Sequence, residues 1–438
     1  MEFGKRVQTP KAGTADGFTF GNVSPSAQHK TVVIGHGLSG RETVKAILKE
    51  KGHKTAITVI NPNNFYESDV VTPFALKRPD LYEKNFSAPE HQLRVPGVEY
   101  ITAKVVSISP VDKTSYVISL SAGDDIVVNA VIICTSFSHP LTKAAVGVTW
   151  EERKAEMETY RKSVAAADTV MVVGGGTVGC EVAGTFRSMI KPGAKVVHVV
   201  SGDLLLSDKF SQREREMLTN KVRTFPEVEL VTGDRLEGHA VASATKATYK
   251  LKSGREIVAD VMIPSFAKFQ TDFLPPELKT KGGAVKVDSC LMSTEWKNVF
   301  AVGCSDVNEH CAIPKILSQA STVGKNVALV SDNKTASVKH KTGAPFLKAE
   351  YAVFYGDWGM VLNDEIGCLG TLCFACGFPF PCFLAPCTPW CGVCGLNCTR
   401  PAGKNVPAFF EAMFSKGPFG PVVSKADKKA PFSSSMER

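Results

Sequence analysis

Two short glycine-rich stretches carry the strongest chemical signal in the sequence. GHGLSG occupies residues 35–40 after TVVI at residues 31–34, and GGGTVG occupies residues 174–179 after the apolar residues 170–173. In G-x-G-x-x-G spacing between a strand and a helix, the first glycine permits a tight turn and the second lets the backbone approach a pyrophosphate. The third glycine lets the helix pack closely on the strand. The two stretches therefore predict two Rossmann-type units, each with a dinucleotide site.

The start of the helix after each turn should help to hold phosphates. Its free backbone N–H groups and the positive end of the helix dipole face the turn. We therefore expect the turn and the first helical residues to bind the dinucleotide. In the first unit these are Gly35, Gly37, Leu38, Ser39 and Gly40, and in the second they are Gly174, Gly176, Thr177, Val178 and Gly179.

The elements around the two turns repeat in the same order, which indicates an α/β fold with an internal duplication. A strand at residues 55–61 and a β-rich stretch at 98–136 follow the first turn. A strand at residues 195–201 and a second β-rich stretch at 227–265 follow the second turn. The charged residues 151–166 between the two units predict a helix that crosses from one to the other.

Composition narrows the class of protein. A chain of 438 residues predicts two or three domains, and 44% hydrophobic and 21% charged residues are ordinary for a globular protein. The net charge of +8 is mild. The sequence lacks a dense Lys/Arg stripe interleaved with aromatic residues, so it gives no sign of nucleic-acid binding. Residues 1–29 are polar and lack the apolar segment of a secretory signal. We expect an intracellular protein, cytoplasmic or organellar, with no nucleic-acid partner.

A third motif comes late in the chain. Residues 298–307, NVFAVGCSDV, predict a short buried strand, and an apolar helix follows at residues 316–332. Two glycine turns followed by such a strand, in this order, resemble the pyridine nucleotide-disulfide oxidoreductase flavoproteins. Within them the sequence is most similar to the apoptosis-inducing-factor-like and ferroptosis-suppressor-type branch, with type II NADH dehydrogenases as relatives. The resemblance covers residues 30–365 and is most specific at VVGGGTVGCEVAG and at NVFAVGCSDV…IPKILSQA.

The resemblance implies two cofactors and a division of the chain. The first turn would bind FAD, the second would bind NAD(P)H, and the late strand and helix would return to the FAD domain. A hydride could then pass from the nicotinamide to the flavin. The implied segments are a flexible tail (1–29), the FAD-binding domain in two parts (30–150 and 276–340), the NAD(P)-binding domain (151–275), and a C-terminal α+β region (341–438) with a Cys-rich loop (368–398) and a basic tail.

The resemblance also implies roles for single residues. For FAD they are Asn61 at the end of the second strand, Val105, Gly303 and Asp306, and for NAD(P)H the residue is Ser201. Glu181 would lie near the nicotinamide ribose or the flavin, although an acid at that place is also favoured by the helix dipole alone. Lys315 matches a family lysine near the flavin ring, although without the match it is merely a helix-start residue. No metal site is implied.

Several positions depart from the family pattern, and most concern FAD. Asn61 replaces an acid that hydrogen-bonds the adenosine ribose, Phe74 stands in place of an arginine, and Ser136 in place of a glycine. In the family an Asp directly follows the glycine of the late strand. Here either Cys304 replaces it or Asp306 serves two positions later. We expect FAD binding to persist because the turn contacts come from the backbone, whereas a degenerate copy without FAD is the alternative.

The cysteines fall into two groups. Those outside residues 368–398 read as reduced intracellular thiols, and they are Cys134, Cys180, Cys290, Cys304 and Cys311. No C-x-x-C or C-x4-C pair follows the first glycine turn, where a flavin-linked disulfide reductase would carry its redox pair. That reaction class is therefore disfavoured.

The remaining eight cysteines lie in a stretch without any charge, residues 366–399. Prolines in it forbid a long helix, so a transmembrane span is not expected. An uncharged Phe/Leu/Pro-rich loop followed by basic residues fits membrane contact through residues 366–429, with or without S-acylation. Two C-x-x-C pairs at near zinc-ribbon spacing leave a zinc site open, and a structural or partner-binding loop is the third interpretation.

These observations favour an FAD-dependent NAD(P)H oxidoreductase that passes electrons to a small, quinone-like acceptor at a membrane surface. The alternative is a non-catalytic family member that serves as a structural or assembly subunit, in which the altered flavin positions and the Cys-rich loop bind a partner.

Overall fold

The computed structural model describes residues 29–50, 52–68, 72–77, 79–83, 87–238, 240–266, 268–307, 313–341, 351–355 and 358–362. The predicted N-terminal tail up to residue 28, the Cys-rich loop and the basic tail lie outside these residues, as does Cys311.

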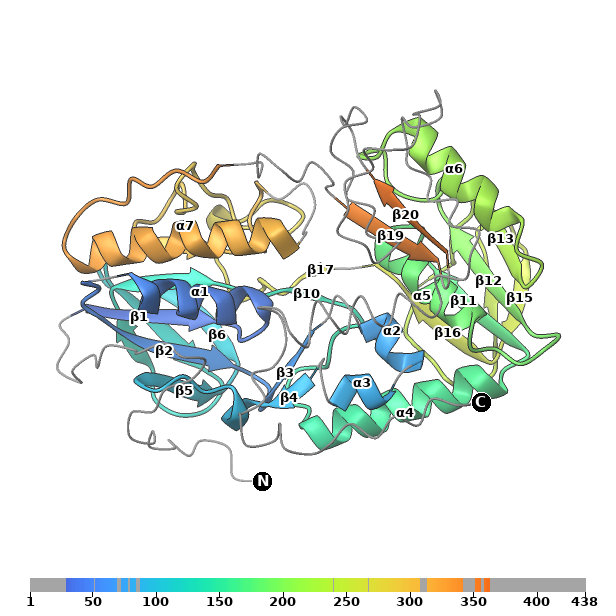
Figure 1. The fold of residues 1–438 in the computed structure, drawn as a ribbon, viewed down its shortest axis with the longest axis horizontal. Coiled ribbons are helices and arrows are strands. Elements are labelled where there is room, and N and C mark those ends of the chain that lie inside the picture. Colours follow the sequence, from blue (N-terminus) through green and yellow to red (C-terminus); the bar gives the residue numbers. More distant parts are fainter. Residues whose placement is uncertain are drawn as a thin grey trace, which may run out of the picture.

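The first unit is built on a five-stranded sheet in the order β18-β9-β1-β2-β5, with all neighbouring strands parallel. Its strands are β1 (His29–Ile34), β2 (Thr55–Asn61), β5 (Val98–Thr102), β9 (Ala130–Ile133) and β18 (Val299–Ala301). The central strand is buried on both faces, as expected for a parallel sheet covered on both sides. One cover is formed by the helices α1 (Leu38–Lys49) and α7 (Ile313–Ser331), and the other includes the meander β6 (Val105–Pro110), β7 (Tyr116–Leu120) and β8 (Ile126–Val128) (Figure 1).

The contact between α1 and α7 brings the late part of the chain back to the first unit. A Cβ atom on Gly324 of α7 would lie 2.7 Å from the Cβ of Ala46 in α1, so the two helices approach as closely as backbones allow. Val44 and Ile47 of α1 share a core with Val323 and Val327 of α7. The late strand β18 and helix α7 therefore complete the sheet and the core that begin at residue 29.

The second unit repeats the arrangement on a smaller scale. Its parallel sheet has the order β13-β12-β11-β16, with β11 (Thr169–Val173), β12 (Lys195–Val200), β13 (Val228–Thr232) and β16 (Val261–Pro264). Its helices are α5 (Thr177–Arg187) and α6 (Gln212–Arg223), and an antiparallel hairpin joins β14 (Ala247–Lys250) to β15 (Glu256–Ala259). The order β16-β11-β12-β13 matches β9-β1-β2-β5, so the α/β class and the two dinucleotide-binding units predicted from the sequence are confirmed.

Two connections join the units, which lie side by side in Figure 1. The helix α4 (Trp150–Ala166) begins beside β4, between the units, and runs toward the second unit; its capping box has Thr149 and Glu152 satisfying each other's backbone N–H groups. The strands β10 (Phe137–Ser138) and β17 (Lys268–Phe269) pair in an antiparallel manner between the sheets. The small elements beside α4 are β3 (Phe65–Glu67), α2 (Thr72–Lys77), α3 (Pro79–Leu81), β4 (Ser87–Pro89) and η2 (Glu90–Gln92), and η3 (Pro276–Leu278) follows β17.

The described C-terminal part is an antiparallel hairpin, β19 (Tyr351–Tyr355) and β20 (Trp358–Leu362). Tyr355 is fully buried in the core of the second unit and stacks on Phe225 at 5.8 Å between ring centroids. The hairpin is therefore anchored to the second unit, next to α5 (Figure 1).

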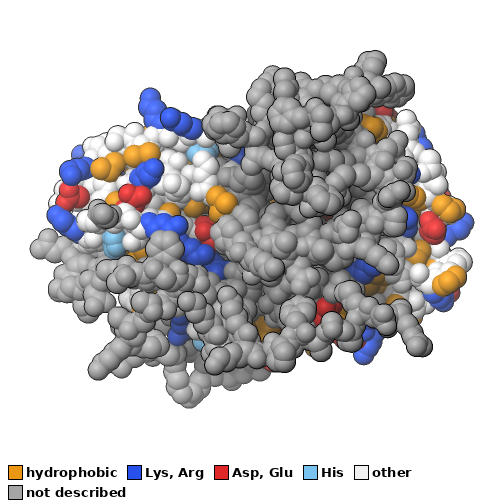
Figure 2. Space-filling view, viewed as in Figure 1, with side chains coloured by type: hydrophobic (Ala, Val, Ile, Leu, Met, Phe, Trp, Pro, Cys, Tyr) orange, Lys and Arg blue, Asp and Glu red, His pale blue; other side chains and the backbone are white. Residues whose placement is uncertain are grey.

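The surface of the first unit is mixed where the structure describes it. Basic, acidic and uncharged side chains alternate over the part of this unit that Figure 2 exposes. Among the described residues, no helix is both long and apolar enough to cross a membrane.

Candidate functional site

The first glycine turn is closed by backbone contacts that leave no room for side chains at two of its glycines. Gly35 has a φ of +102°, and a Cβ on it would lie 2.8 Å from the carbonyl oxygen of Cys134, which follows β9. A Cβ on Gly40 would lie 1.9 Å from the carbonyl oxygen of Gly35. The turn therefore requires glycine at both positions, as the G-x-G-x-x-G spacing predicts.

The middle glycine of this turn has a different environment. A Cβ on Gly37 would meet only the Nζ of Lys143, at 3.9 Å, among the described atoms. Gly37 is the N-cap residue of α1, and no side chain caps this helix end. The first N–H groups of α1 consequently point toward open space beside the turn, which is the arrangement that binds phosphate.

That space is a cavity of about 430 Å³ at the carboxyl ends of β1 and β2. Its volume lies within the usual range of sites for small molecules and cofactors. The glycine turn, the ends of β2 and β9 and the start of β6 form part of its lining, and the loop after β10 and the segment from β17 onward form the rest. The lining residues include His36, Gly37, Asn61, Val105, Ser136, Lys143, Lys268 and Phe273. The glycine cradle, the uncapped helix and the nearby lysine fit the phosphate-bearing ADP half of FAD.

Two residues predicted to bind FAD lie in this lining. Val105 is buried at the start of β6. Asn61 uses its amide on the protein itself, because its Oδ1 accepts from the His36 N–H (3.1 Å) and its Nδ2 donates to the Asn63 carbonyl (2.7 Å). Asn61 therefore fastens the glycine turn to the end of β2. Its predicted contact with the ribose stays a prediction.

The late strand reaches the start of α1. A Cβ on Gly303, whose φ is +82°, would lie 2.5 Å from the Oγ of Ser39, and the Gly303 N–H donates to Oε1 of Gln319 in α7 (2.9 Å). Leu38, beside Ser39, is buried in the core of the first unit. The structure thus brings together Leu38, Ser39 and Gly303, which were predicted to bind FAD and come from two distant parts of the chain.

Cys304 and Asp306 differ in their placement. The Cys304 side chain is fully buried, and its thiol donates to the Ile133 carbonyl at 3.2 Å. Asp306 is exposed after the strand, and its Oδ1 accepts from the Val287 N–H at 3.1 Å. Neither lines the cavity beside the first turn, so which of them serves the flavin is still a prediction.

The second glycine turn has the same backbone geometry. Gly174 has a φ of +127°, and a Cβ on it would lie 2.6 Å from the Ser265 carbonyl oxygen; a Cβ on Gly179 would lie 1.9 Å from the Gly174 carbonyl oxygen. A Cβ on Gly176, the uncapped N-cap of α5, would meet no described atom within 4 Å. Thr177, Val178 and Ser201, also predicted for NAD(P)H, are partly or fully exposed around this turn.

The two predicted catalytic residues sit at helix starts in different units. Glu181 is partly buried in α5, five residues beyond the N-cap Gly176, and Lys315 is partly buried in the first turn of α7. Neither lines the cavity of the first turn. The segments 69–71 and 308–312, and the side chain of Phe74, lie outside the described residues. The placement of Glu181 and Lys315 relative to a flavin stays a prediction.

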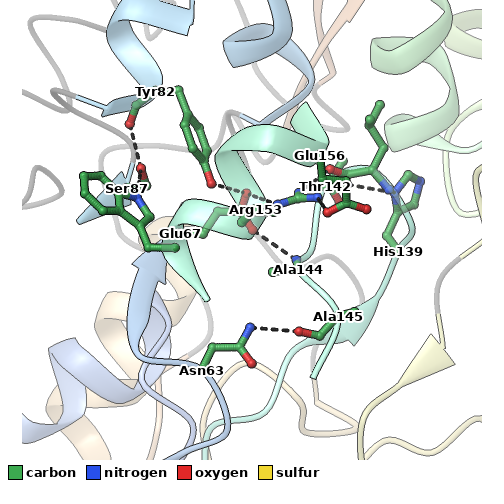
Figure 3. A network of polar contacts seen from close by, with 12 residues as sticks. Asn63, Glu67, Tyr82, Ser87, His139, Thr142, Ala144, Ala145, Arg153 and Glu156 are labelled. Atoms are coloured by element: carbon green, nitrogen blue, oxygen red, sulfur yellow. Dashed lines mark hydrogen bonds and ion pairs between the residues drawn. The ribbon is translucent and has the colours of Figure 1, made fainter. Parts of the chain in front are cut away.

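A buried network that no sequence motif predicts supports the cavity (Figure 3). Arg153 of α4 is fully buried and donates through Nε to Oε1 of Glu67 at 2.9 Å. Tyr82 also donates to Oε1, and the Ala144 N–H donates to Oε2. Burial raises the pKa of the Glu67 carboxyl, whereas the Arg153 charge opposes the shift. Since Glu67 and Ala144 line the cavity, the network fixes one wall of it.

The same loop touches the second unit. His139 is buried; its Nδ1 accepts from the N–H groups of Leu141 and Thr142, and its Nε2 lies 3.3 Å from the Oγ of Ser265. Ser265 is the residue against which Gly174 packs. Burial, helped by the Arg153 charge, lowers the pKa of His139 to about 4, so it is neutral at physiological pH. Loop 139–144 thus joins the first cavity to the base of the second turn.

A buried histidine also supports the second turn itself. His198 of β12 is fully buried, and its Nε2 lies 2.9 Å from the Gly174 carbonyl, to which it donates. Burial lowers its pKa to about 4. Nothing in the local sequence marked His198 or Arg153, since a single polar residue in a strand or in a charged helix gives no sign of its burial. Among the described residues, no cluster of His, Cys, Asp or Glu could hold a metal ion.

Known proteins agree with this architecture. The chain is 24% identical over 365 residues to the apoptosis-inducing factor homolog A of Dictyostelium discoideum, covering 75% of this chain and 84% of the relative. It is 26% identical over 219 residues to the FAD-dependent oxidoreductase FVFD30 of Flammulina velutipes, covering 48% and 67%. The Dictyostelium relative agrees with the predicted apoptosis-inducing-factor-like branch.

Solved structures share the fold. The water-forming NADH oxidase from Lactobacillus brevis, bound to NADH, superposes with a TM-score of 0.56 at 18% identity, covering 72% of this chain and 71% of that one. The NAD-dependent persulfide reductase from A. fulgidus gives a TM-score of 0.56 at 18% identity, covering 76% and 63%.

The family model for pyridine nucleotide-disulphide oxidoreductases matches residues 29–329, which include both glycine turns and both parallel sheets. The predicted cofactors, FAD and NAD(P)H, are confirmed by this match. The chain belongs to the pyridine nucleotide-disulphide oxidoreductase family.

Proposed function

We propose that this NAD(P)H-dependent flavoprotein passes electrons from the nicotinamide, through FAD, to a small quinone-like acceptor at a membrane surface. The observation that carries the proposal is the pair of glycine turns, alike in backbone and different in surroundings, each at the end of a parallel sheet. Bound FAD supplies the two-electron chemistry between nicotinamide and acceptor.

The residues of the chain contribute binding and orientation. The backbone at Gly37 and the first turn of α1 would hold the phosphates of FAD, and the backbone at Gly176 and the first turn of α5 would hold those of NAD(P)H. Glu181 would orient the nicotinamide end, and Lys315, at the start of α7, would add positive charge near the flavin. These two assignments rest on the family resemblance.

The choice of acceptor rests on the residues of the helix after the first turn. The first cysteine of the chain is Cys134, so α1 carries no cysteine pair that could relay electrons to a disulfide. An acceptor must therefore reach the flavin itself, which favours a small molecule. The uncharged residues 366–399 and the basic residues after them support peripheral attachment to a membrane, where a lipid-soluble quinone would be concentrated.

A turnover assay tests the acceptor. Purified protein should be yellow and should oxidise NADH or NADPH much faster with a short-chain benzoquinone than with oxygen or with a glutathione disulfide control. Colourless protein that takes up no added FAD would support the structural-subunit alternative instead. Yellow protein that reduces disulfides but no quinone would contradict the proposed acceptor.

A fractionation experiment tests the membrane proposal. Replacing all eight cysteines between residues 368 and 398 with serine should move the protein from the membrane fraction to the soluble fraction of the expressing cells. Quinone reduction in solution should persist, because the substitutions change none of the residues assigned to the two nucleotide sites. One zinc ion per wild-type chain, with no change in membrane partition in the variant, would contradict membrane attachment and support the zinc interpretation.

A further inference from the structure

The cavity beside the first turn contains polar side chains, and most of them are engaged with protein groups. Asn61 bonds the backbone through both ends of its amide. Both carboxylate oxygens of Glu67 accept from protein donors. Lys268 pairs with Asp272 at 3.0 Å. Two further groups of the lining, His36 and Lys143, lie at the glycine turn.

His36 is one such group. It stands between the first two glycines of the turn, it is only 2% exposed, and it lines the cavity. Its ring packs edge-on against Tyr100, with 5.2 Å between ring centroids. Its Nδ1 is buried and has no hydrogen-bond partner among the described residues. Leaving a buried polar atom without a partner is costly, so this nitrogen indicates that a bound group completes the site.

The imidazole is held neutral. Burial, with smaller contributions from the charges of Arg41, Arg94 and Lys45, lowers the pKa of His36 to about 3. At physiological pH the ring can therefore offer a hydrogen bond but no charge.

Lys143 supplies the charge. Its Nζ lies 3.9 Å from the place that a Cβ on Gly37 would occupy, directly beside the uncapped start of α1. The loop that carries Lys143 is fixed on both sides of it, by the Ala144 N–H bond to Glu67 and by the Thr142 N–H bond to His139. An ammonium group held beside a helix N-terminus strengthens the attraction for phosphate.

We propose that His36 and Lys143 bind the ADP half of FAD and replace the ribose-binding acid that this chain lacks at Asn61. Lys143 contributes positive charge for the phosphates, and His36 contributes a hydrogen bond that the apo protein leaves unmade. This inference rests on the assignment of FAD to the first turn. It does not depend on which acceptor the enzyme reduces.

Binding of FAD to the apo protein tests the proposal. Lys143→Met should weaken FAD binding by about tenfold or more, since hydrogen bonds to charged groups contribute at least that much. Lys143→Arg should recover most of the loss. Lys113→Met, which removes the same charge from the exposed turn between β6 and β7, should bind FAD as the wild type does.

His36→Phe separates binding from stability. The substitution keeps an aromatic ring against Tyr100 and removes the buried nitrogen without a partner, so the apo variant should melt at the wild-type temperature or above it. Its FAD affinity should nevertheless fall about tenfold. A residue with a merely structural role would give the opposite pattern, a less stable apo protein with unchanged affinity.

Competition by ADP locates the effect within FAD, because only ligands of the first turn displace the bound flavin. This competition gives the dissociation constant of ADP for each variant. In Lys143→Met and His36→Phe, the dissociation constants of ADP and FAD should rise by the same factor. Wild-type FAD and ADP affinities in both variants would overturn the proposal. A wild-type protein that binds FAD but reduces no quinone would contradict the proposed acceptor alone.

Discussion

The two glycine turns have nearly the same backbone and open into different spaces. In each, a Cβ on the first glycine would collide with the carbonyl after the neighbouring strand, and a Cβ on the third would lie 1.9 Å from the carbonyl of the first. Beside Gly37, however, lies a cavity of about 430 Å³ with Lys143 in its lining, whereas a Cβ on Gly176 would meet no described atom within 4 Å.

The difference matches what each nucleotide must do. A ligand enclosed on several sides buries most of its surface and dissociates slowly. With FAD at the first turn, as proposed, this enclosure would keep the cofactor bound over many turnovers. NAD(P)H must bind and leave in every turnover, and the described residues leave the space beside Gly176 unfilled. We therefore expect the two turns, alike in backbone, to differ in how long they hold a nucleotide.

The second position of each turn shows the same divergence. A Cβ on Gly175 would lie 2.3 Å from Cγ1 of Val200 at the end of β12, so only glycine fits. In the first turn the corresponding strand ends in Asn61, whose amide bonds the His36 backbone, and an imidazole is accommodated. The residue that ends the second strand therefore decides whether the turn can carry a side chain for recognition.

The largest effects are expected where the two turns are alike. Gly40→Ala and Gly179→Ala each place a methyl group 1.9 Å from a backbone oxygen that cannot move without opening the turn. Each substitution should destabilise its own unit by more than about 4 kcal/mol, as other severe backbone conflicts do. Urea unfolding, with hydrogen exchange to identify the affected unit, measures this. A Gly40→Ala protein with wild-type stability would show that the turn is not closed as described.

Breaking the buried ion pair should affect one site and spare the other. Arg153→Met leaves the Glu67 carboxylate buried without its cation and should cost about 3–5 kcal/mol. Because Glu67 lines the first cavity, flavin should be released more readily while NAD(P)H affinity changes little. Arg161→Met, on the same helix with a half-exposed partner in Glu158, should cost less than about 1 kcal/mol. Equal effects of the two substitutions would contradict the described burial.

Acidification should destabilise both units through buried histidines. The folded-state pKa values of His36 (about 3), His139 and His198 (both about 4) lie below the ordinary value of 6.5, mainly because of burial. The unfolded chain therefore takes up protons first as pH falls. The stability that these groups contribute is lost as pH falls from about 6.5 to the folded-state pKa, about 4 for His139 and His198 and about 3 for His36.

The stability lost on acidification can be compared between the two units. At pH 5 each fully buried histidine should cost about 2 kcal/mol, from 1.36 kcal/mol per pH unit. Urea midpoints at pH 7 and pH 5 for the wild type, His36→Gln and His198→Gln measure the shares of the first and second unit. If neither variant reduces the acid sensitivity, the histidines are not buried in neutral form.

A smaller effect should separate adjacent positions in the second turn. Gly175→Ala, which meets Val200, should cost about 1–3 kcal/mol. Gly176→Ala, with open space around its Cβ and an extended backbone (φ −71°), should cost less than about 1 kcal/mol. Thermal unfolding of the pair checks the difference. Equal costs at the two positions would mean that the turn is not open on the side of Gly176.

The sequence could predict what is local. The turns, their strands and the duplicated order follow from glycine spacing and apolar runs, and they were placed correctly. Contacts between distant residues could not be predicted. Arg153 meets Glu67 across 86 positions, and no pattern in the charged helix distinguishes Arg153 from its exposed neighbours. Likewise, nothing in GHGLSG shows that His36 is buried, because its burial depends on Tyr100 and on the shape of the cavity.

The central claim is that the first turn retains FAD and the second exchanges NAD(P)H. Valine at each middle glycine, in matched variants, tests it directly, because a Cβ at either position meets no backbone atom and the fold should survive. Gly37→Val should be purified without flavin. Gly176→Val should keep one flavin per chain that NADH and NADPH bleach far more slowly than in the wild type under anaerobic stopped flow. A Gly37→Val protein with full flavin, or a Gly176→Val protein bleached at the wild-type rate, would contradict the account.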